Sequence, residues 1–177
     1  MLERRSALAT ATPYKNSELH IAERRGFSLL QAAGLTDDFE ALLAAALGSV
    51  PEKVGLAHDQ DGRTVMRIGP SQFWIIGPET DDLADRLNDW CAVTPLSHSR
   101  TRIGLSGAPA RAVLSKLSPV DFHPKAFPPG SFALTGIHHT PVTIHCTGDT
   151  AFDIYAMRTF ALNVWEVITD AALEFAE

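Results

Sequence analysis

The residues best suited to chemistry gather in one proline-rich stretch, SPVDFHPKAFPPG at 118–130. Asp121, His123 and Lys125 bring a carboxylate, an imidazole and an ammonium group close together among four prolines. Because proline restricts the backbone before any binding occurs, such a loop loses little entropy when it docks. Two roles stay open: a preformed loop that binds a partner or lines a substrate site, and a structural crossover between helix and strand. The candidate apolar anchors of the loop are Phe122 and Phe127.

Seven histidines raise the question of a metal site. The sequence contains no HExxH and no CxxC motif, and two cysteines are too few for an all-thiolate zinc site. The simpler interpretation is surface and loop histidines, so we assign no metal ligand and no catalytic residue. A hydrolase or metalloenzyme built on His98, Asp121 and His123 is kept as an alternative.

The glycine motifs do not indicate a nucleotide site. GLSG at 104–107 precedes an expected helix, whose first N–H groups could hold an anion. The chain has neither GxGxxG nor GxxxxGK[ST], the patterns of dinucleotide and nucleoside triphosphate sites. We therefore expect a tight strand-to-helix turn with Ser106 as the helix cap, and no cofactor-binding residue can be named.

Composition and charge restrict the partners. The 177 residues are 45% hydrophobic and 20% charged, as in ordinary globular domains, and the net charge is −6. An acidic chain is a poor candidate for binding nucleic acid or an anionic membrane surface, because both attract basic proteins. No apolar run resembles a secretory signal or a membrane span, so we expect a cytoplasmic protein with two free thiols.

The elements that position these residues form two similar halves after an aperiodic N-terminal tail, residues 1–17, which we expect to order only against something else. Hydrophobic spacing, caps and turn residues predict the following elements in the first half, 18–90: a strand region at 20–30, a helix at 37–47, strands at 63–69 and 73–77, and a helix at 81–90 capped by Thr80. Those in the second half, 91–177, are a long or broken strand at 92–106, a helix at 109–117, strands at 131–135, 141–146 and 151–156, and a helix at 159–175. The apolar stripe of that last helix is expected to comprise Leu162, Trp165, Ile168 and Leu173.

The two halves are interpreted as repeats of one order of elements: strand, helix, strand, strand, helix, with one further strand in the second half. The segments FWII at 73 and FDIY at 152 occupy the same place in each half. The distance in sequence from Leu83 to Leu162 equals the distance between the starts of these two segments. Helices cover only one face of the sheet in such a unit, so two units can pair their sheets or share one layer of sheet. The sequence therefore predicts an α+β fold with a duplicated βαββα unit, within a single domain over 18–177.

Several segments resemble the gamma subunit of heterotetrameric sarcosine oxidase. The resemblance is strongest after residue 90 and covers most of the chain. The similar segments are RSALA at 5–9, IGPSQFWIIGP at 68–78, SHSRTRIGLSGAPARAVLSKLSPVDFHPKAFPPGSFALT at 97–135, and FDIYAMRTFALNVWEVITDAALEF at 152–175. The most specific landmark is HPKAFPPG, residues 123–130.

The resemblance implies a fold akin to the amino-terminal domain of folate-dependent aminomethyltransferases. It also implies an enzyme of four different subunits that oxidatively demethylates sarcosine to glycine, with the one-carbon unit passed to tetrahydrofolate. FAD, FMN and NAD would lie on the alpha and beta subunits, with tetrahydrofolate also expected on a partner. A related subunit set acts on other N-methylated amino acids such as N-methylglutamate.

Three functions follow. The preferred one is a non-catalytic gamma subunit that docks on the alpha and beta partners through residues 1–17, the SHSRTR segment (97–102) and the proline-rich loop. The complex also contains a delta partner, and the chain could form a homodimer when isolated. The second is a stand-alone folate or one-carbon binding module, and the third is the histidine-based hydrolase. The candidate interface residues are Arg100, Arg102, His123, Lys125, Phe127, Pro128 and Pro129.

Overall fold

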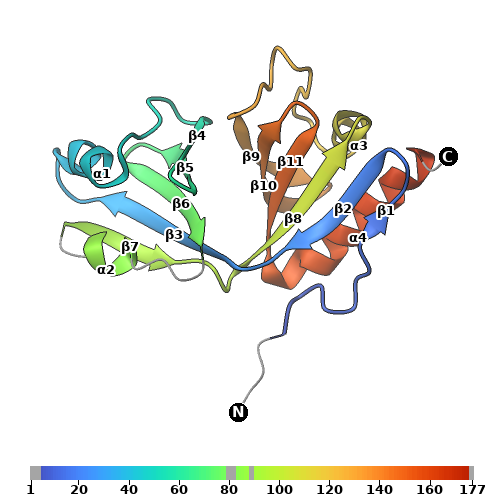
Figure 1. Cartoon of the computed structure of the whole chain (residues 1–177), viewed down its shortest axis with the longest axis horizontal. Coiled ribbons are helices and arrows are strands. Elements are labelled where there is room, and N and C mark those ends of the chain that lie inside the picture. The colour runs from blue at the N-terminus through green and yellow to red at the C-terminus, as the bar shows by residue number, and fades with distance from the viewer. Residues whose placement is uncertain (1–4, 79–82, 88–89, 176–177) are drawn as a thin grey trace. The chain divides into compact units, whose positions relative to one another are not determined.

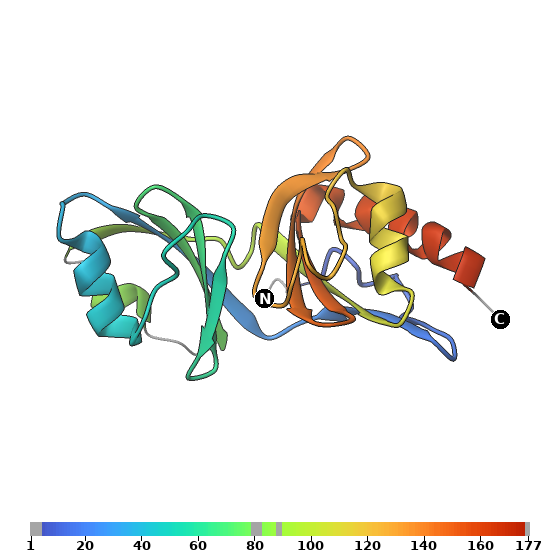
Figure 2. The same ribbon diagram turned by 90° about the horizontal axis from the view of Figure 1, so that it is seen from above.

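The computed structural model describes residues 5–78, 83–87 and 90–175. The chain forms two compact units, unit 1 (Met1–Arg25 with Ser99–Glu177) and unit 2 (Gly26–His98). Each unit has one antiparallel sheet with helices on one face (Figures 1 and 2). The α+β fold is confirmed, but the two units do not coincide with the expected halves 18–90 and 91–177.

Unit 2 holds a five-stranded sheet and two helices. Its strands lie in the order β4-β5-β6-β3-β7. The elements are β3 (Phe27–Gly34), α1 (Phe39–Leu47), β4 (Ala57–Gln60), β5 (Arg63–Gly69), β6 (Gln72–Pro78), α2 (Leu83–Leu87) and β7 (Cys91–Pro95). Both helices pack on the same face of this sheet, where Leu43 of α1 and Leu83 of α2 join Phe73 and Ile75 of β6 in one core. The Thr80 cap lies outside the described residues.

Unit 1 holds a six-stranded sheet in the order β1-β2-β8-β11-β10-β9. Its elements are β1 (Tyr14–Lys15), β2 (Leu19–Arg24), β8 (Arg100–Gly107), α3 (Ala110–Leu117), β9 (Phe132–Ile137), β10 (Thr140–Gly148), β11 (Ala151–Met157) and α4 (Ala161–Ala172), with short 3₁₀ turns at Arg158–Phe160 and Leu173–Phe175 on either side of α4. Residues of α3 and α4 share a core with the sheet, as Val113, Trp165 and Ile154 illustrate.

The two sheets have the same internal order, which confirms the duplication, although each repeat has three strands between its helices (β4 to β6 and β9 to β11) where the expected βαββα unit has two. Strands β4-β5-β6-β3-β7 of unit 2 correspond in order to β9-β10-β11-β8-β2 of unit 1. In unit 1 the last of these places is taken by β2, which comes from the N-terminal end of the chain. The second repeat therefore lacks a strand of its own there, and the strand that precedes the first repeat supplies it.

Because β2 completes the sheet of unit 1, the observed unit boundaries differ from the expected boundaries of the two halves. The single strand region expected at 20–30 is two strands, separated at Gly26, whose φ of 71° suits glycine far better than other residues. Strand β2 pairs with β8 of unit 1, whereas β3 pairs with β6 and β7 of unit 2. The strand expected at 92–106 as long or broken is the broken one, divided into β7 and β8.

Two local expectations need correction. In α4 the buried face is formed by Ala161, Val164, Trp165, Ile168, Ala171 and Ala172, whereas Leu162 and Leu173 are 42% and 59% exposed. Trp165 and Ile168 of the expected stripe are buried, whereas Leu162 lies outside the i, i+3, i+4 spacing of the buried residues and Leu173 lies in the 3₁₀ turn after the helix. Ser106 does not cap α3, because β8 continues to Gly107 and Pro109 takes the cap position without a side-chain hydrogen bond.

The N-terminal segment is ordered against its own unit from Arg5 onward, which differs from the expected tail. Leu8 is 1% exposed and belongs to the unit 1 core. Tyr14 pairs with Ile21 to place β1 at the sheet edge, and the Asn16 side chain donates to the carbonyl of Phe175 at 2.9 Å. The segment thus contributes a short strand and a core residue to unit 1.

Candidate functional site

The proline-rich loop is held to unit 1 by its two phenylalanines. Phe122 and Phe127 are 3% and 6% exposed, and their rings meet edge to face with centroids 5.4 Å apart. Phe122 also packs edge to face on Phe152 of β11, at 6.1 Å. Both anchors are therefore buried in the chain's own core, and Phe127 cannot present its ring to a partner in this conformation.

Arg111 of α3 fixes the same loop through hydrogen bonds to its backbone. Its Nη1 donates to the carbonyl oxygens of Phe122 and Phe127, at 2.7 and 3.0 Å, and its Nε donates to the carbonyl of Asp149 at 2.8 Å. The guanidinium lies 5.1 Å from the ring centroid of Phe152. One cation thus satisfies carbonyl groups from two segments that would otherwise need other partners.

The loop turns its polar side chains outward. The Asp121 carboxylate accepts from the backbone N–H of His123 at 2.9 Å, and the amides of Ala126 and Phe127 donate to the carbonyl of His123. These bonds fix a compact turn. The exposed residues of the loop are Pro119, Asp121, His123, Pro124, Lys125, Ala126, Pro128 and Pro129. Four of the five interface residues expected in this loop are therefore exposed to a partner: His123, Lys125, Pro128 and Pro129.

The other expected interface residues, Arg100 and Arg102, lie on β8, away from the loop in sequence. Arg102 donates to Asp153 of β11 at 2.5 Å, and Arg24 of β2 lies 2.9 Å from the other oxygen of that carboxylate. Asp153 is 1% exposed, on the sheet face opposite the helices. Two cations compensate this buried carboxylate, as the desolvation cost of an ionised group requires.

Gly104 makes this arrangement possible. It lies on β8 between the strands of Arg24 and Asp153, opposite Ala22 on one side and Asp153 on the other. A Cβ at position 104 would overlap Nε of Arg24. The absent side chain is therefore the space through which Arg24 reaches across β8 to the carboxylate.

Replacing Gly104 by alanine is expected to displace Arg24 and leave Asp153 with Arg102 alone. We expect a loss of about 1–2 kcal/mol in the free energy of unfolding, less than for a fully buried pair because Arg24 is half exposed. Urea titrations of Gly104→Ala, Arg24→Ala and the double variant measure this. The two losses should not add, since both remove one ion pair. Gly148→Ala is the control, because its new Cβ makes only an ordinary contact at 3.5 Å; additive losses would contradict the assignment.

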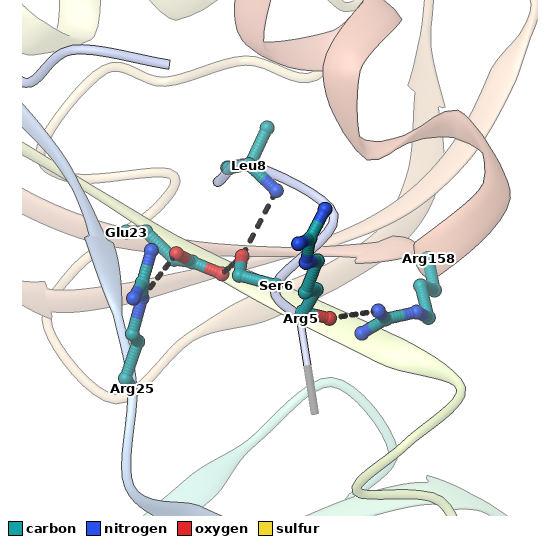
Figure 3. Close-up of polar contacts among 6 residues, drawn as sticks. All are labelled: Arg5, Ser6, Leu8, Glu23, Arg25 and Arg158. Carbon is teal, nitrogen blue, oxygen red and sulfur yellow. Dashed lines mark hydrogen bonds and ion pairs between the residues drawn. The ribbon is translucent and has the colours of Figure 1, made fainter. Parts of the chain in front are cut away.

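The N-terminal segment adds a second polar cluster to unit 1 (Figure 3). Ser6 Oγ donates to the Glu23 carboxylate and accepts the backbone N–H of Leu8 at 2.9 Å. Arg25 pairs with the other oxygen of Glu23 at 2.5 Å. Arg158, directly after β11, donates to the carbonyl of Arg5. These contacts fix the start of the segment beside the ends of β2 and β11.

The alternative histidine site is not assembled within one unit. His98 belongs to unit 2, whereas Asp121 and His123 belong to unit 1. Among the residues that the structure describes, no group of three or more His, Cys, Asp and Glu side chains is placed to hold a metal ion. Cys91 and Cys146 are free and buried, as expected, and burial raises the pKa of both thiols.

Sequence reasoning missed the residues that hold these features in place. Arg24, Arg111 and Asp153 look like ordinary surface charges, because their partners lie far away in sequence. One signal was available for Asp153: it stands in FDIYA, between apolar residues on a strand, where a charged side chain requires a buried partner. The sequence alone gives no means of naming Arg24 and Arg102 as those partners.

The helices of the described residues include none that is long and apolar enough to cross a membrane.

Residues 55–176 match the family model of the GCVT N-terminal domain. Similarity to solved structures agrees: glycine cleavage system aminomethyltransferase T from Bartonella henselae superposes with a TM-score of 0.65 at 16% identity, over 85% of this chain and 45% of that one. The fold is thus that of the amino-terminal domain of aminomethyltransferases, as the resemblance implied.

More similar proteins share one name. Sarcosine oxidase subunit gamma of a Corynebacterium species (strain P-1) is 31% identical over 95% of this chain and 84% of its own length. The Arthrobacter subunit gamma is 35% identical over 77% and 70%. A chain of heterotetrameric sarcosine oxidase from Corynebacterium sp. U-96 superposes with a TM-score of 0.89 at 28% identity, covering 98% of this chain and 97% of that chain. This protein therefore belongs to the family of sarcosine oxidase gamma subunits.

Proposed function

We propose that this chain is the accessory gamma subunit of a heterotetrameric, flavin-dependent sarcosine oxidase. The observation that carries the proposal is the superposition on a chain of such an oxidase, which covers nearly the whole of both chains. In this role the chain supports an enzyme that oxidatively demethylates sarcosine to glycine and passes the one-carbon unit to tetrahydrofolate. FAD, FMN and NAD are held by the alpha and beta partners, and tetrahydrofolate is bound on a partner subunit as well.

The features of unit 1 support a docking role. The loop at 118–130 is fixed in advance by Arg111 and by its two buried phenylalanines, so it loses little freedom when a partner covers it. Its exposed face combines the imidazole of His123 and the ammonium group of Lys125 with three prolines, Pro124, Pro128 and Pro129. A rigid, mixed polar and apolar protrusion of this kind suits the rim of a protein–protein interface.

A reconstitution experiment tests the proposal. The other three subunits are purified without this chain, and then mixed with it at equal molarity. We expect a stable complex on size-exclusion chromatography, with hydrogen peroxide formed on addition of sarcosine. The same preparation assayed with N-methylglutamate decides between the two substrate classes. A chain that neither joins the complex nor changes its yield would refute the accessory role.

A second candidate is a stand-alone folate or one-carbon binding module, which the match to the GCVT N-terminal domain favours. Titration calorimetry of the isolated chain with tetrahydrofolate distinguishes the two. Binding by the chain alone, without partner subunits, supports the module. No heat of binding, together with successful reconstitution, supports the gamma subunit.

A further inference from the structure

A groove lies between the two helices of unit 1. Helices α3 and α4 are neighbours on one face of the six-stranded sheet (Figures 1 and 2). The space between them has a volume of about 430 Å³ and opens to the solvent. We call it the helix groove, and its lining includes Lys116 and Leu117 of α3, His138 of the turn between β9 and β10, and Glu166, Val167 and Asp170 of α4.

The floor of the helix groove is apolar, and one of its ends is fixed by a backbone contact. Leu117 is buried in the core of unit 1, and Val167 is half-buried against the same core. The backbone N–H of His138 donates to the carbonyl of Leu117 at 3.2 Å, which holds the β9–β10 turn against the end of α3. The groove is therefore formed before anything binds, and its floor suits the methylene chain of a long side chain.

The wall of the groove on α4 is acidic. Glu166 and Asp170 are about one helical turn apart, so they lie on the same side of α4, and both are exposed. Among the described residues that line the groove, Lys116 supplies the only permanent cation. Its ammonium group contacts Glu174 and lies 3.5 Å from the carbonyl oxygen of Ala171. The lining thus carries two carboxylates whose charge it does not itself neutralise.

These two carboxylates disfavour the helix that carries them. Like charges one turn apart repel each other. Asp170 also lies in the last turn of α4, where the negative end of the helix dipole disfavours a carboxylate, and that turn, which is fully described, has no basic residue. Local rules that a sequence breaks without a gain in the fold itself point to a functional position. A cation bound at Glu166 and Asp170 would compensate for both unfavourable effects.

We infer that the helix groove binds a basic segment of a partner subunit of the oxidase. A lysine or arginine side chain lies along the apolar floor, and its charged end contacts Glu166 and Asp170. The inference rests on the proposed function and adds the location and the chemistry of one contact.

The surroundings of the groove favour a protein over smaller cations. No group of three or more His, Cys, Asp and Glu side chains among the described residues is placed to hold a metal ion. Leu173 follows Glu166 by seven residues, a spacing that places it on the same side of the helix, and it is 59% exposed. A free polyamine would leave this leucine uncovered, whereas a protein surface combines charged contacts with apolar ones.

The first part of the test removes the two charges and keeps the size of the side chains. The groove variant of the full chain carries Glu166→Gln and Asp170→Asn. We expect it to melt at the wild-type temperature or about 1–2 °C above it, because the changes relieve the repulsion and the unfavourable dipole contact. A clear fall in the melting temperature would show that the pair stabilises the chain itself, and would overturn the inference.

The second part measures binding to the immobilised complex of the other three subunits, at sodium chloride concentrations from low to high. We expect the groove variant to bind about tenfold more weakly than the wild type at low salt, with a smaller difference at high salt, where charges are screened. The control variant carries Asp37→Asn and Glu52→Gln, which remove two exposed carboxylates of unit 2. It should bind like the wild type.

The outcomes separate this inference from the function on which it rests. If the wild type binds and the groove variant binds equally well at low salt, the helix groove is not the contact, although the accessory role stands. If the wild type does not bind the other subunits, the proposed function itself fails, and this inference fails with it.

Spermidine is the probe for a small cation as the occupant. We expect it to leave the melting temperature of the isolated wild type unchanged at concentrations well below that of the salt. If spermidine instead stabilises the wild type but not the groove variant, and both bind the partner subunits equally, the occupant is a free polyamine and the inference is overturned.

Discussion

Phe127→Ala is expected to lower the free energy of unfolding by about 3–5 kcal/mol, the range for truncating a buried phenylalanine. The ring is 6% exposed and meets Phe122 edge to face, so its removal leaves a cavity in the unit 1 core and releases one anchor of the proline-rich loop. Urea unfolding followed by tryptophan fluorescence measures the loss. The effect is on the fold, and so a loss of complex in this variant would not by itself identify a contact.

Phe160→Ala is the matched control, because this phenylalanine lies in the same unit but is 46% exposed. Its truncation should change stability by no more than about 0.5 kcal/mol, as is usual at the surface. Equal losses in the two variants would contradict the burial of the loop anchors. The proposed contact of the loop is better tested by His123→Ala with Lys125→Ala, because both side chains are exposed. This double variant should bind the partners more weakly than the wild type without a loss of stability.

Replacing Arg24 and Arg102 together by methionine is expected to destabilise the protein by about 3 kcal/mol, the low end for removing the partners of a buried charge. Asp153 is 1% exposed, and both arginines contact its carboxylate, at 2.9 and 2.5 Å. The double variant leaves an ionised group in the sheet without compensation. Methionine keeps much of the side-chain volume, so the loss reports charge more than packing.

A triple variant gives the control for this prediction. Adding Asp153→Asn to the double variant removes the uncompensated charge and should recover most of the lost stability, because an amide costs far less to bury than a carboxylate. Guanidinium chloride would screen these charges, so urea is the denaturant of choice. If the asparagine variant is no more stable than the double variant, the arginines act through packing and the electrostatic account is wrong.

The elements of the fold were largely predictable from local patterns, but their assignment to sheets was not. Alternating and continuous apolar runs identify most strands, including β5, β6 and β10, and apolar spacing identifies α1 and α3. Strand β4 was missed because AHDQ has little apolar pattern. The exchange that places β2 in unit 1 depends on pairing between residues about 80 positions apart, and no local signal specifies that pairing.

In the candidate site, too, features set by local sequence were predictable, whereas contacts between distant residues were not. The proline-rich loop was singled out by its composition, and its role at an interface stays a prediction; Asp121, His123 and Lys125 are exposed, as a docking surface requires. Its phenylalanines were expected as anchors, and the structure shows that they anchor the loop to its own unit. Arg111 and Asp153 were missed because a charged residue reveals its role only through partners that the fold brings together.

The central claim, that this chain is a subunit of a flavoprotein oxidase, is tested most directly by co-purification from the native cell. The chain is tagged at its C-terminus and isolated under mild conditions, and the visible absorption spectrum of the eluate is recorded together with the masses of the accompanying proteins. We expect a yellow complex with flavin absorbance, containing three further subunits in equal amounts. A colourless preparation of this chain alone, at a salt concentration that preserves protein complexes, would contradict the claim.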